Sequence, residues 1–399
     1  MSNNKVRLAV GLDLGSTNTR MVICVLENDG IRFLGHGEAP STGWSRGRLN
    51  DQEALTESIR FATQEAERRA QVSPEAVVLG IGGPNVSGIN SRGLYEFGRK
   101  RQIEIDDLRY AVELAAKVRL EDDRLVLQVC PQDFTLDGRA GYRNPRGIAC
   151  ARLEANVHVV TASAQEHQAL LTAVHEAHLA AEESVFEAVA GAYASVLPED
   201  RARGVCVVDI GAQSTHIAIY EGDALMLATT LPIAGDHFTR DISYILKANY
   251  DDAEHLKREY GWALSGLTSD HSVIELPSPE GRAPREVFRS TLNEILEARA
   301  EELLGHVYDE IRRVGMEQSL LEGVVLTGGG ALLNGMCDIA ERVLNCQVRN
   351  GLAIGIEDWP EELDTPIWAT AAGLAMYSGR LKLKSEWKRS VGGLSALMR

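Results

Sequence analysis

Residues 205–220 read VCVVDIGAQSTHIAIY, a stretch that predicts two strands joined by a short turn. The β-branched run Val205–Val208 predicts a buried strand, and a second apolar run, Ile217–Tyr220, predicts a returning strand. Asp209 stands at the end of the first strand, before a turn of small and hydroxylated residues. Because nothing bulky blocks such a turn, its backbone N–H groups can approach a phosphate, and the neighbouring carboxylate can hold a magnesium ion.

The same pattern occurs near the N-terminus. Residues 8–14, LAVGLDL, predict a strand with Asp13 near its end, and a turn and a returning strand follow. Asp13 precedes Asp209 by 196 residues, and a glycine and a threonine of each hairpin keep the same offset. Two such hairpins at matching register predict a duplicated α/β unit that binds a nucleotide between its halves.

A third segment completes the predicted nucleotide site. Residues 324–336, VVLTGGGALLNGM, predict a strand, a glycine turn and the start of a helix, against which adenosine and ribose can lie. Asp13 and Asp209 are the candidate Mg²⁺ ligands, acting through water, and Asp209 is the better candidate. The candidate nucleotide-binding residues of the three segments are Asp13, Gly15, Ser16, Thr17, Asn18, Asp209, Gly211, Ala212, Gln213, Ser214, Gly328, Gly329 and Gly330.

These segments resemble the two phosphate motifs and the adenosine motif of the superfamily that includes actin, sugar kinases and DnaK-type chaperones. Further stretches resemble one family within it, the bacterial cell-division FtsA family. They are PQDFTLDG (131–138), NPRGIACARLEANVHVVTA (144–162), GVCVVDIG (204–211) and ELPSPEGRAPR (275–285). The resemblance covers residues 5 to about 379. It implies ATP and Mg²⁺ as the ligands of the cleft.

The resemblance also implies an actin-like, two-lobed α/β fold with ribonuclease H-like cores and a small α/β subdomain inserted in the first half. Two helices rich in small residues, near 187–196 and 365–377, are predicted to cross at the hinge between the lobes. The implied division is 1–82, 163–200 and 361–379 for the first core lobe, 83–162 for the inserted subdomain, 201–238 and 301–360 for the second core lobe, 239–300 for its subdomain, and 380–399 for a C-terminal tail.

Two departures from relatives bear on chemistry. Asn18 stands near the position where many relatives carry a lysine, which predicts slow phosphoryl transfer at best, and Ala212-Gln213 replaces a glycine run. Glu187 resembles the superfamily's water-orienting glutamate, although an acid at a helix N-terminus is also favoured by the helix dipole. By resemblance Glu254 and Lys257 flank the adenine; solvated helix charges are the alternative.

Composition excludes some classes of function. The chain has 399 residues, with 41 basic and 57 acidic side chains and a net charge of −16, which argues against a nucleic-acid partner. Six scattered cysteines without a C-x-x-C pair predict reduced thiols in a cytoplasmic protein. No secretory signal and no stretch of bilayer-spanning length is expected.

The last twenty residues reverse the charge of the chain, with six basic residues and one acidic residue in 380–399. Helical spacing places Trp387, Val391, Leu394, Leu397 and Met398 on one apolar face. This pattern predicts an amphipathic helix on an anionic membrane surface, as FtsA proteins have; a frayed soluble end is the alternative.

The predicted function is that of an actin-like ATP-binding cell-division protein. It would polymerise head to tail on the inner face of the cytoplasmic membrane at the division site, and tether FtsZ filaments there with other divisome proteins. Contact with the FtsZ C-terminal peptide is expected near Arg282, Arg285, Arg289 and Arg299, unless these arginines only pair with nearby glutamates. The inserted subdomain, including a predicted exposed loop at 137–144, is expected to take part in stacking. A PilM-like pilus-assembly protein and a small-molecule kinase are the alternatives.

Overall fold

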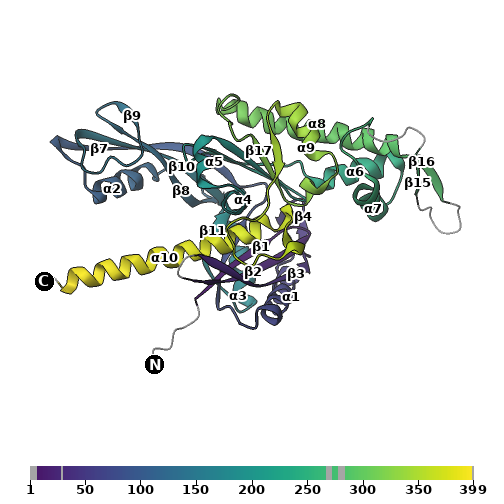
Figure 1. Cartoon of the computed structure of the whole chain (residues 1–399), viewed down its shortest axis with the longest axis horizontal. Helices are drawn as coiled ribbons and strands as arrows, with labels where there is room; N and C mark the ends of the chain where they lie inside the picture. The colour runs from purple at the N-terminus through teal and green to yellow at the C-terminus, as the bar shows by residue number, and fades with distance from the viewer. Residues whose placement is uncertain (1–6, 28–29, 267–271, 277–283, 398–399) are drawn as a thin grey trace.

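The computed structural model of the chain describes residues 7–27, 30–266, 272–276 and 284–397, with only the helical backbone described for 384–397. Two lobes lie one above the other in Figure 1, and two smaller parts project to either side. The arrangement is the duplicated actin-like α/β fold that the two hairpins predict.

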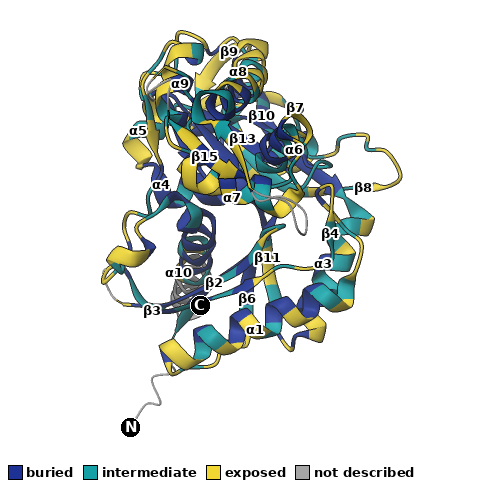
Figure 2. Cartoon of the chain, turned by 90° about the vertical axis from the view of Figure 1, so that its right-hand side faces the viewer, coloured by how far each residue is buried: buried dark blue, intermediate teal, exposed yellow. Residues whose placement is uncertain are grey.

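The first lobe is built on a five-stranded sheet in the order β11-β6-β1-β2-β3. The hairpin β1–β2 is antiparallel, and β1 pairs in parallel with β6. Helices α1 and α3 pack beside this sheet, and Figure 2 shows the buried face of α1 turned toward it. The side chain of Asp51 caps α1 by accepting a hydrogen bond from the amide of Ala54. The elements are β1 (Leu8–Leu14), β2 (Asn18–Leu26), β3 (Ile31–Pro40), β6 (Ala76–Ile81), β11 (Ala180–Phe186), α1 (Gln52–Ala70) and α3 (Ala164–Glu176). A small hairpin, β4 (Trp44–Ser45) with β5 (Arg48–Leu49), follows β3.

The second lobe repeats this plan. Its sheet has the order β14-β13-β12-β17-β18, in which β12–β13 is the antiparallel hairpin and β12 pairs in parallel with β17. The strands are β12 (Val205–Ile210), β13 (Thr215–Glu221), β14 (Ala224–Leu231), β17 (Val324–Thr327) and β18 (Val348–Asn350). Matching hairpins and matching parallel neighbours in both sheets confirm the predicted duplication.

Two helices cross between the lobes. They are α4 (Glu187–Ser195) and α10 (Ala369–Leu397). A Cβ added to Gly373 would lie 1.8 Å from the carbonyl oxygen of Ala190, so the two backbones touch at a position that only glycine allows. The predicted helix crossing is therefore present. A short helix, α5 (Pro198–Arg203), leads from α4 into the second lobe.

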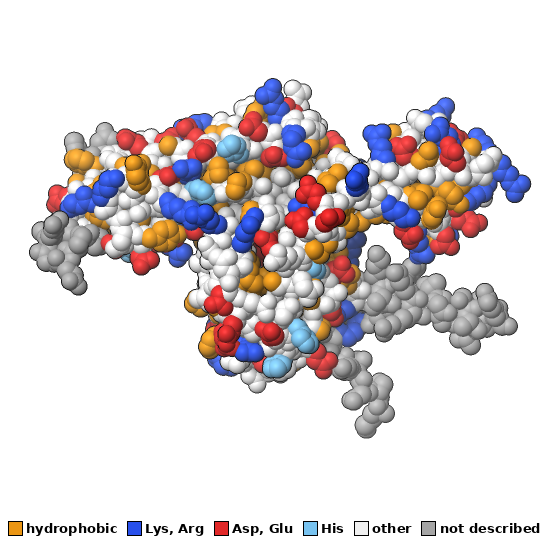
Figure 3. Space-filling view, turned by 180° about the vertical axis from the view of Figure 1, so that it is seen from behind, with side chains coloured by type: hydrophobic (Ala, Val, Ile, Leu, Met, Phe, Trp, Pro, Cys, Tyr) orange, Lys and Arg blue, Asp and Glu red, His pale blue; other side chains and the backbone are white. Residues whose placement is uncertain are grey.

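The inserted subdomain is a four-stranded sheet in the order β7-β10-β8-β9, covered on one face by α2. Its elements are β7 (Ser87–Gln102), α2 (Ile105–Ala115), β8 (Arg124–Leu136), β9 (Arg139–Tyr142) and β10 (Ala149–Ser163). The predicted loop at 137–144 is wrong in part, because β9 lies within it and pairs with β8. Figure 3 shows the subdomain standing clear of the lobes on the right, with Lys and Arg side chains over much of its visible outline.

The second lobe's own subdomain is mainly helical. It contains α6 (Gly235–Leu246), α7 (Tyr250–Tyr260), the hairpin of β15 (Val273–Leu276) and β16 (Arg285–Phe288), and much of α8 (Arg289–Arg313). Two predicted boundaries, 238/239 and 300/301, lie inside α6 and α8, so continuous helices join the subdomain to its lobe. The glycine turn forms η1 (Gly329–Leu332), followed by α9 (Met336–Leu344), and η2 (Glu361–Leu363) and η3 (Pro366–Trp368) lead into α10.

The tail begins without a linker. Helix α10 starts at the lobe interface, passes the predicted boundary at 379/380 and runs through Gly392 and Gly393 to Leu397. Lys382 still belongs to the core, because its Nζ donates to the carbonyl oxygen of Leu8 at 2.6 Å and lies 3.2 Å from Glu182. Within the described residues, no helix combines the length and apolarity that crossing a membrane requires. Met398 lies outside the described residues.

Candidate functional site

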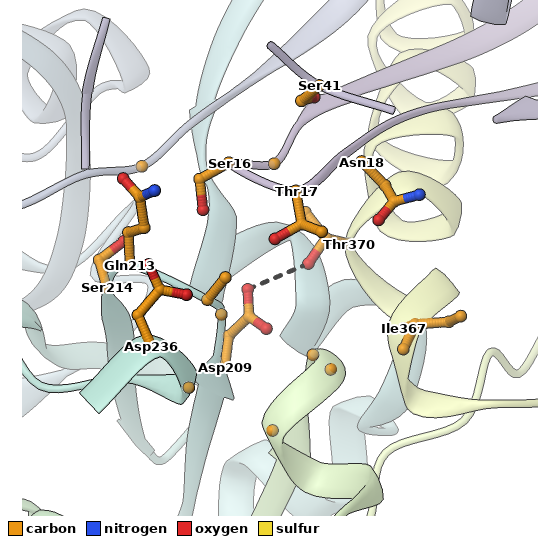
Figure 4. A pocket seen from close by; sticks show the side chains of 18 of the residues that line it. Ser16, Thr17, Asn18, Ser41, Asp209, Gln213, Ser214, Asp236, Ile367 and Thr370 are labelled. Carbon is orange, nitrogen blue, oxygen red and sulfur yellow. Dashed lines mark hydrogen bonds between the residues drawn. The ribbon is translucent and has the colours of Figure 1, made fainter. Parts of the chain in front are cut away.

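A cavity of about 750 Å³ separates the two hairpins. This volume lies within the range of small-molecule sites. The lining includes every residue predicted for nucleotide binding, and also Glu187, Glu254 and Lys257. Figure 4 shows Ser16 and Thr17 of the first hairpin facing Asp209 and Ser214 of the second. The structure therefore brings together three segments that lie far apart in the sequence.

The two turns have the same geometry. A Cβ added to Gly15 would lie 2.8 Å from the carbonyl oxygen of Asn18, and one added to Gly211 would lie 2.9 Å from that of Ser214. The amide of Gly211 also donates to the Ser214 carbonyl at 3.0 Å. A side chain at either glycine would force the tight turn open, so both positions need the absence of a Cβ.

Three carboxylates converge in the cavity. Asp13, Glu187 and Asp209 are each less than 10 % exposed. Burial, and next the negative charge of Glu187, raise the pKa of Asp13 well above its usual value, while Arg20 opposes the rise. Keeping all three groups ionised in a buried site is costly unless a cation balances them. Oxygen ligands of this kind fit Mg²⁺. Asp209 is further held by the Thr370 hydroxyl, which donates to its Oδ2 at 3.3 Å (Figure 4).

His216 is a central residue of the cavity that the sequence reasoning missed. Its Nδ1 lies 3.0 Å from Oε2 of Glu187 and 3.8 Å from Oδ2 of Asp209. Its Nε2 accepts a hydrogen bond from the amide of Gly83 at 3.0 Å and lies 3.0 Å from the Ser214 hydroxyl. The hairpin register contained the signal, because Asp209 and His216 are directly paired across β12 and β13.

The protonation state of His216 follows from these contacts. Burial lowers its pKa, but the carboxylates of Glu187 and Asp209 outweigh burial and raise it. The Gly83 amide nevertheless needs a lone pair on Nε2, and a proton there would face the N–H directly. We therefore assign the neutral ring with its proton on Nδ1, the nitrogen 3.0 Å from Glu187, although among the described residues this N–H is not aligned for a hydrogen bond. This assignment leaves the negative charge of the cavity for a divalent cation to balance.

Arg20 is a second residue that the sequence reasoning missed. It lines the same cavity, two residues beyond Asn18 on β2, and is paired with Asp13 across the hairpin. Its Nη2 bonds to Glu38 at 2.8 Å, and within the described part of the chain its buried Nε has no hydrogen-bond partner. The absence of a lysine at Asn18 therefore does not leave the first hairpin without a cation.

The glycine turn lies against the end of β12. A Cβ added to Gly328 would lie 2.4 Å from Oδ1 of Asp209, and one added to Gly330 would lie 2.3 Å from Cγ2 of Ile210. These two glycines are required by packing. A Cβ added to Gly329 would meet no heavy atom within 4 Å, and this residue lines the cavity. Gly329 is thus the position of the turn where a side chain would compete with a ligand and leave the fold intact.

Glu254 and Lys257 form a half-buried ion pair in the lining of the cavity. Lys257 Nζ lies 2.6 Å from Oε2 of Glu254 and donates to the Thr239 hydroxyl at 2.8 Å and to the Gly235 carbonyl at 3.1 Å. Burial lowers the pKa of Lys257, and Glu254 opposes that effect. The alternative of solvated helix charges is wrong for Lys257, whose side chain is 14 % exposed.

The arginines predicted for partner binding do not form one patch. Arg299 donates through Nε and Nη2 to Asp241 at 2.5 and 2.9 Å, so it joins α8 to α6 and is neutralised there. Arg289 donates to the Tyr260 carbonyl at 2.8 Å, and Arg285 donates to the Leu246 carbonyl. Arg282 lies outside the described residues. Among the residues that the structure describes, Arg285 and Arg289 have carbonyl partners and no acidic partner.

The fold and the cleft define an actin-like protein with duplicated lobes and an inserted subdomain. Solved structures agree on the fold. A "PilM-PilN type IV pilus biogenesis complex" aligns over 93 % of this chain and 98 % of that chain, with a TM-score of 0.67 and 19 % identity. A "Crystal structure of MreB 5 of Spiroplasma citri bound to AMPPNP" aligns over 95 % of this chain and 98 % of that chain, with a TM-score of 0.57 and 14 % identity.

Sequence comparison places the chain within the superfamily. The profile "Cell division protein FtsA" matches residues 206–373, and "SHS2 domain inserted in FTSA" matches residues 83–161. The cell division protein FtsA of Escherichia coli (strain K12) is 33 % identical over 388 residues, which cover 95 % of this chain and 92 % of that protein. FtsA of Pseudomonas aeruginosa is 33 % identical over 390 residues, or 98 % and 93 % of the two chains. This chain belongs to the FtsA family of actin-like cell-division proteins.

Proposed function

We propose that the chain binds ATP with Mg²⁺ in the cleft between the hairpins. The observation that carries the proposal is the convergence of Asp13, Asp209 and Glu187 in a buried cavity lined by two glycine-containing turns. Backbone N–H groups of both turns would hold the phosphates, and Asp209 with Asp13 would hold Mg²⁺ through water. The ion would neutralise the carboxylates and the phosphates together.

Nucleotide titration tests this assignment. Asp209→Ala should abolish Mg²⁺-dependent ATP binding, because it removes the principal metal ligand. Gly329→Glu should block the adenosine side by placing a charged side chain in the cavity, with Gly329→Ala as the matched control that keeps the cavity open. Affinity for Mg-ATP equal to that of the wild type in both Asp209→Ala and Gly329→Glu would refute the site.

Hydrolysis is proposed to be slow. Glu187 is buried at the first residue of α4, and its carboxylate faces the cavity beside His216. In this position it can accept a proton from a water and orient it toward a phosphate. The dipole of α4 also favours an acid here, so the two readings of Glu187 are compatible. Most of the nucleotide's effect would be to set the relative position of the lobes.

The cellular role follows from family membership. We propose that the protein polymerises on the inner face of the cytoplasmic membrane at the division site and tethers FtsZ filaments there. Support comes from helix α10, which runs from the cleft to the basic, amphipathic sequence at 380–399. Exposed apolar side chains of the second-lobe subdomain, among them Tyr244, Ile245 and Phe288, lie in the part of the chain where Arg285 and Arg289 stand, and these residues would suit an acidic, apolar FtsZ peptide.

A PilM-like role is the second candidate, because the PilM-PilN complex shares the fold over most of both chains. The two roles predict different ligands. Pelleting with anionic liposomes separates them: the FtsA-type role predicts that the protein carries purified FtsZ into the pellet when ATP is present. A protein that stays in the supernatant with FtsZ under these conditions would favour the PilM-like role. The kinase alternative would require turnover of a small-molecule substrate.

A further inference from the structure

His216 lies where three parts of the molecule meet. It belongs to β13 of the second lobe, it is 3 % exposed, and it lines the cavity. On one side it faces Glu187, the first residue of the hinge helix α4. On the other side it contacts Gly83, the first residue of the segment that matches the inserted domain.

The two ring nitrogens of His216 contact different parts of the molecule. Nδ1, which carries the proton, lies 3.0 Å from Glu187 and 3.8 Å from Asp209. Nε2 accepts the Gly83 amide at 3.0 Å, with the Ser214 hydroxyl also 3.0 Å away. The Gly83 bond thus determines which nitrogen faces the carboxylates, and a ring turned over would lose both contacts.

The backbone before the inserted subdomain is shaped to receive the ring. A Cβ added to Gly82 would lie 2.2 Å from Oε2 of Glu187 and 2.6 Å from Cε1 of His216. Gly83 adopts φ of +92°, which L side chains rarely adopt. Both glycines therefore let the backbone approach His216 and Glu187 directly. A displacement at this junction would change the position of the ring.

We infer that His216 is a positioning residue that orients the Glu187 carboxylate in the cleft and ties that orientation to the base of the inserted subdomain. The role toward Glu187 rests on the proposed nucleotide function. The link to the base of the inserted subdomain rests on hydrogen-bond geometry alone. Rotation of the lobes would move β13 relative to Gly83. The hydrogen bond between His216 and Gly83 would then transmit the open or closed state of the cleft to the inserted subdomain, which is expected to make filament contacts. Nothing in this link requires the ring to change its charge.

A pair of substitutions separates the role of His216 toward Glu187 from its link to Gly83. The amide of Asn can mimic Nδ1–H, so His216→Asn should keep the contact with Glu187 and lose the acceptor for Gly83. Gln reaches the position of Nε2, so His216→Gln should keep the Gly83 bond and remove the Nδ1–H that lies beside Glu187. His158→Asn is the matched control, because His158 is a buried histidine between the inserted subdomain and the second lobe whose hydrogen bonds go to Asn90 and Ala228, away from the cleft.

Amide hydrogen exchange across residues 82–86 of the full-length protein directly measures the link between His216 and the base of the inserted subdomain. We expect roughly five- to tenfold faster exchange of the Gly83 amide in His216→Asn, and near wild-type protection in His216→Gln and His158→Asn. Single-turnover hydrolysis of bound Mg-ATP measures the role of His216 toward Glu187. Here His216→Gln should be slowed roughly as much as Glu187→Gln, and His216→Asn should be slowed less.

The outcomes distinguish this inference from the proposed function. Equal Gly83 exchange in the Asn and Gln variants would overturn the link to the inserted subdomain, whether or not ATP binds. Wild-type turnover in His216→Gln, with ATP bound normally, would overturn the role toward Glu187. Failure of the wild-type protein to bind Mg-ATP would refute the proposed function and, with it, the role of His216 toward Glu187. The exchange measurement would still decide whether His216 is linked to the inserted subdomain.

Discussion

The hydroxyl of Thr370 donates to Oδ2 of Asp209 across 3.3 Å, and both residues are buried. This bond joins the first turn of α10 to the end of β12, where the predicted metal ligand stands. The same helix continues to Leu397, within the predicted membrane-binding segment. A single helix therefore has the proposed nucleotide cleft at one end and the tail at the other.

Removing this bond should weaken the nucleotide site. Thr370→Val keeps the shape of the side chain and leaves Asp209 without this donor, so we expect Mg-ATP affinity to fall by about 1 kcal/mol, or roughly fivefold. Thr370→Ser keeps the hydroxyl and should bind nearly as well as the wild type. Calorimetric titration with Mg-ATP measures both. Identical affinities for the Val and Ser variants would show that Asp209 does not depend on this bond.

The contact between the inserted subdomain and β14 should depend on pH through His158. This ring is 1 % exposed, its Nε2 accepts the Ala228 amide at 2.9 Å, and its Nδ1 bonds to Asn90 at 2.6 Å. Burial, and next the positive charge of Arg313, lower the pKa of His158 to about 4. The folded state thus favours the neutral ring, since protonation of Nε2 would destroy the acceptor for Ala228.

The sign of the effect follows from the two pKa values. The unfolded chain has a histidine pKa of about 6.5, so it binds the proton first as the pH falls. The stabilisation is complete above pH about 6.5 and is lost progressively toward pH 4, on the order of 2 kcal/mol of unfolding free energy between pH 7 and pH 5. His158→Gln should remove this contribution. Urea unfolding at several pH values checks it: curves with the same pH dependence in wild type and variant would contradict the prediction.

The FtsZ contact is better tested at Arg285 and Arg289 than at Arg299. Arg299 is bonded to Asp241, so reversing its charge would disturb the packing of α8 on α6 and confuse loss of folding with loss of binding. Arg285→Ala with Arg289→Ala should weaken an acidic FtsZ C-terminal peptide by about 1–2 kcal/mol in fluorescence anisotropy, with a smaller effect at high salt. Unchanged affinity in this double variant, at low salt and with unchanged melting temperature, would place the peptide elsewhere.

Sequence reasoning found the hairpins and the glycine turn because local patterns encode them. Residues such as Asp13 and Asp209 mark strand ends, where small turn residues and buried runs are visible in the sequence. It missed His216 and Arg20, although both are cross-strand partners of the predicted aspartates. Period-two alternation alone does not say which face of a hairpin meets the opposite lobe.

Long-range pairing was the other source of difference. Arg299 does pair with a nearby glutamate, Glu302, but it also pairs with Asp241, which lies 58 residues away on another helix. The boundaries at 238/239 and 300/301 were implied by the family resemblance, and the continuous helices α6 and α8 run through both. Such relationships depend on tertiary packing, which overrides local signals.

The tail from 384 to 398 should bind anionic membranes. By spacing, Trp387, Val391 and Leu394 share a face, and each large side chain at the headgroup boundary contributes roughly 1.5–3 kcal/mol before ordering costs. Each nearby lysine or arginine adds about 1 kcal/mol on an anionic surface. Helix formation at Gly392 and Gly393 costs about 2 kcal/mol relative to alanine, so one chain should bind reversibly and a polymer much more firmly.

Liposome pelleting with variants of the tail tests the anchor. Trp387→Glu with Leu394→Glu should release the protein without altering ATP binding, whereas Gly392→Ala with Gly393→Ala should strengthen pelleting by stabilising the helix. A truncated chain should end at Leu383 rather than Gly379, because Lys382 bonds to Leu8 and Glu182 and its loss would disturb the first lobe. If the chain ending at Leu383 pellets with anionic liposomes and ATP as well as the full-length protein does, the membrane contact lies outside the tail.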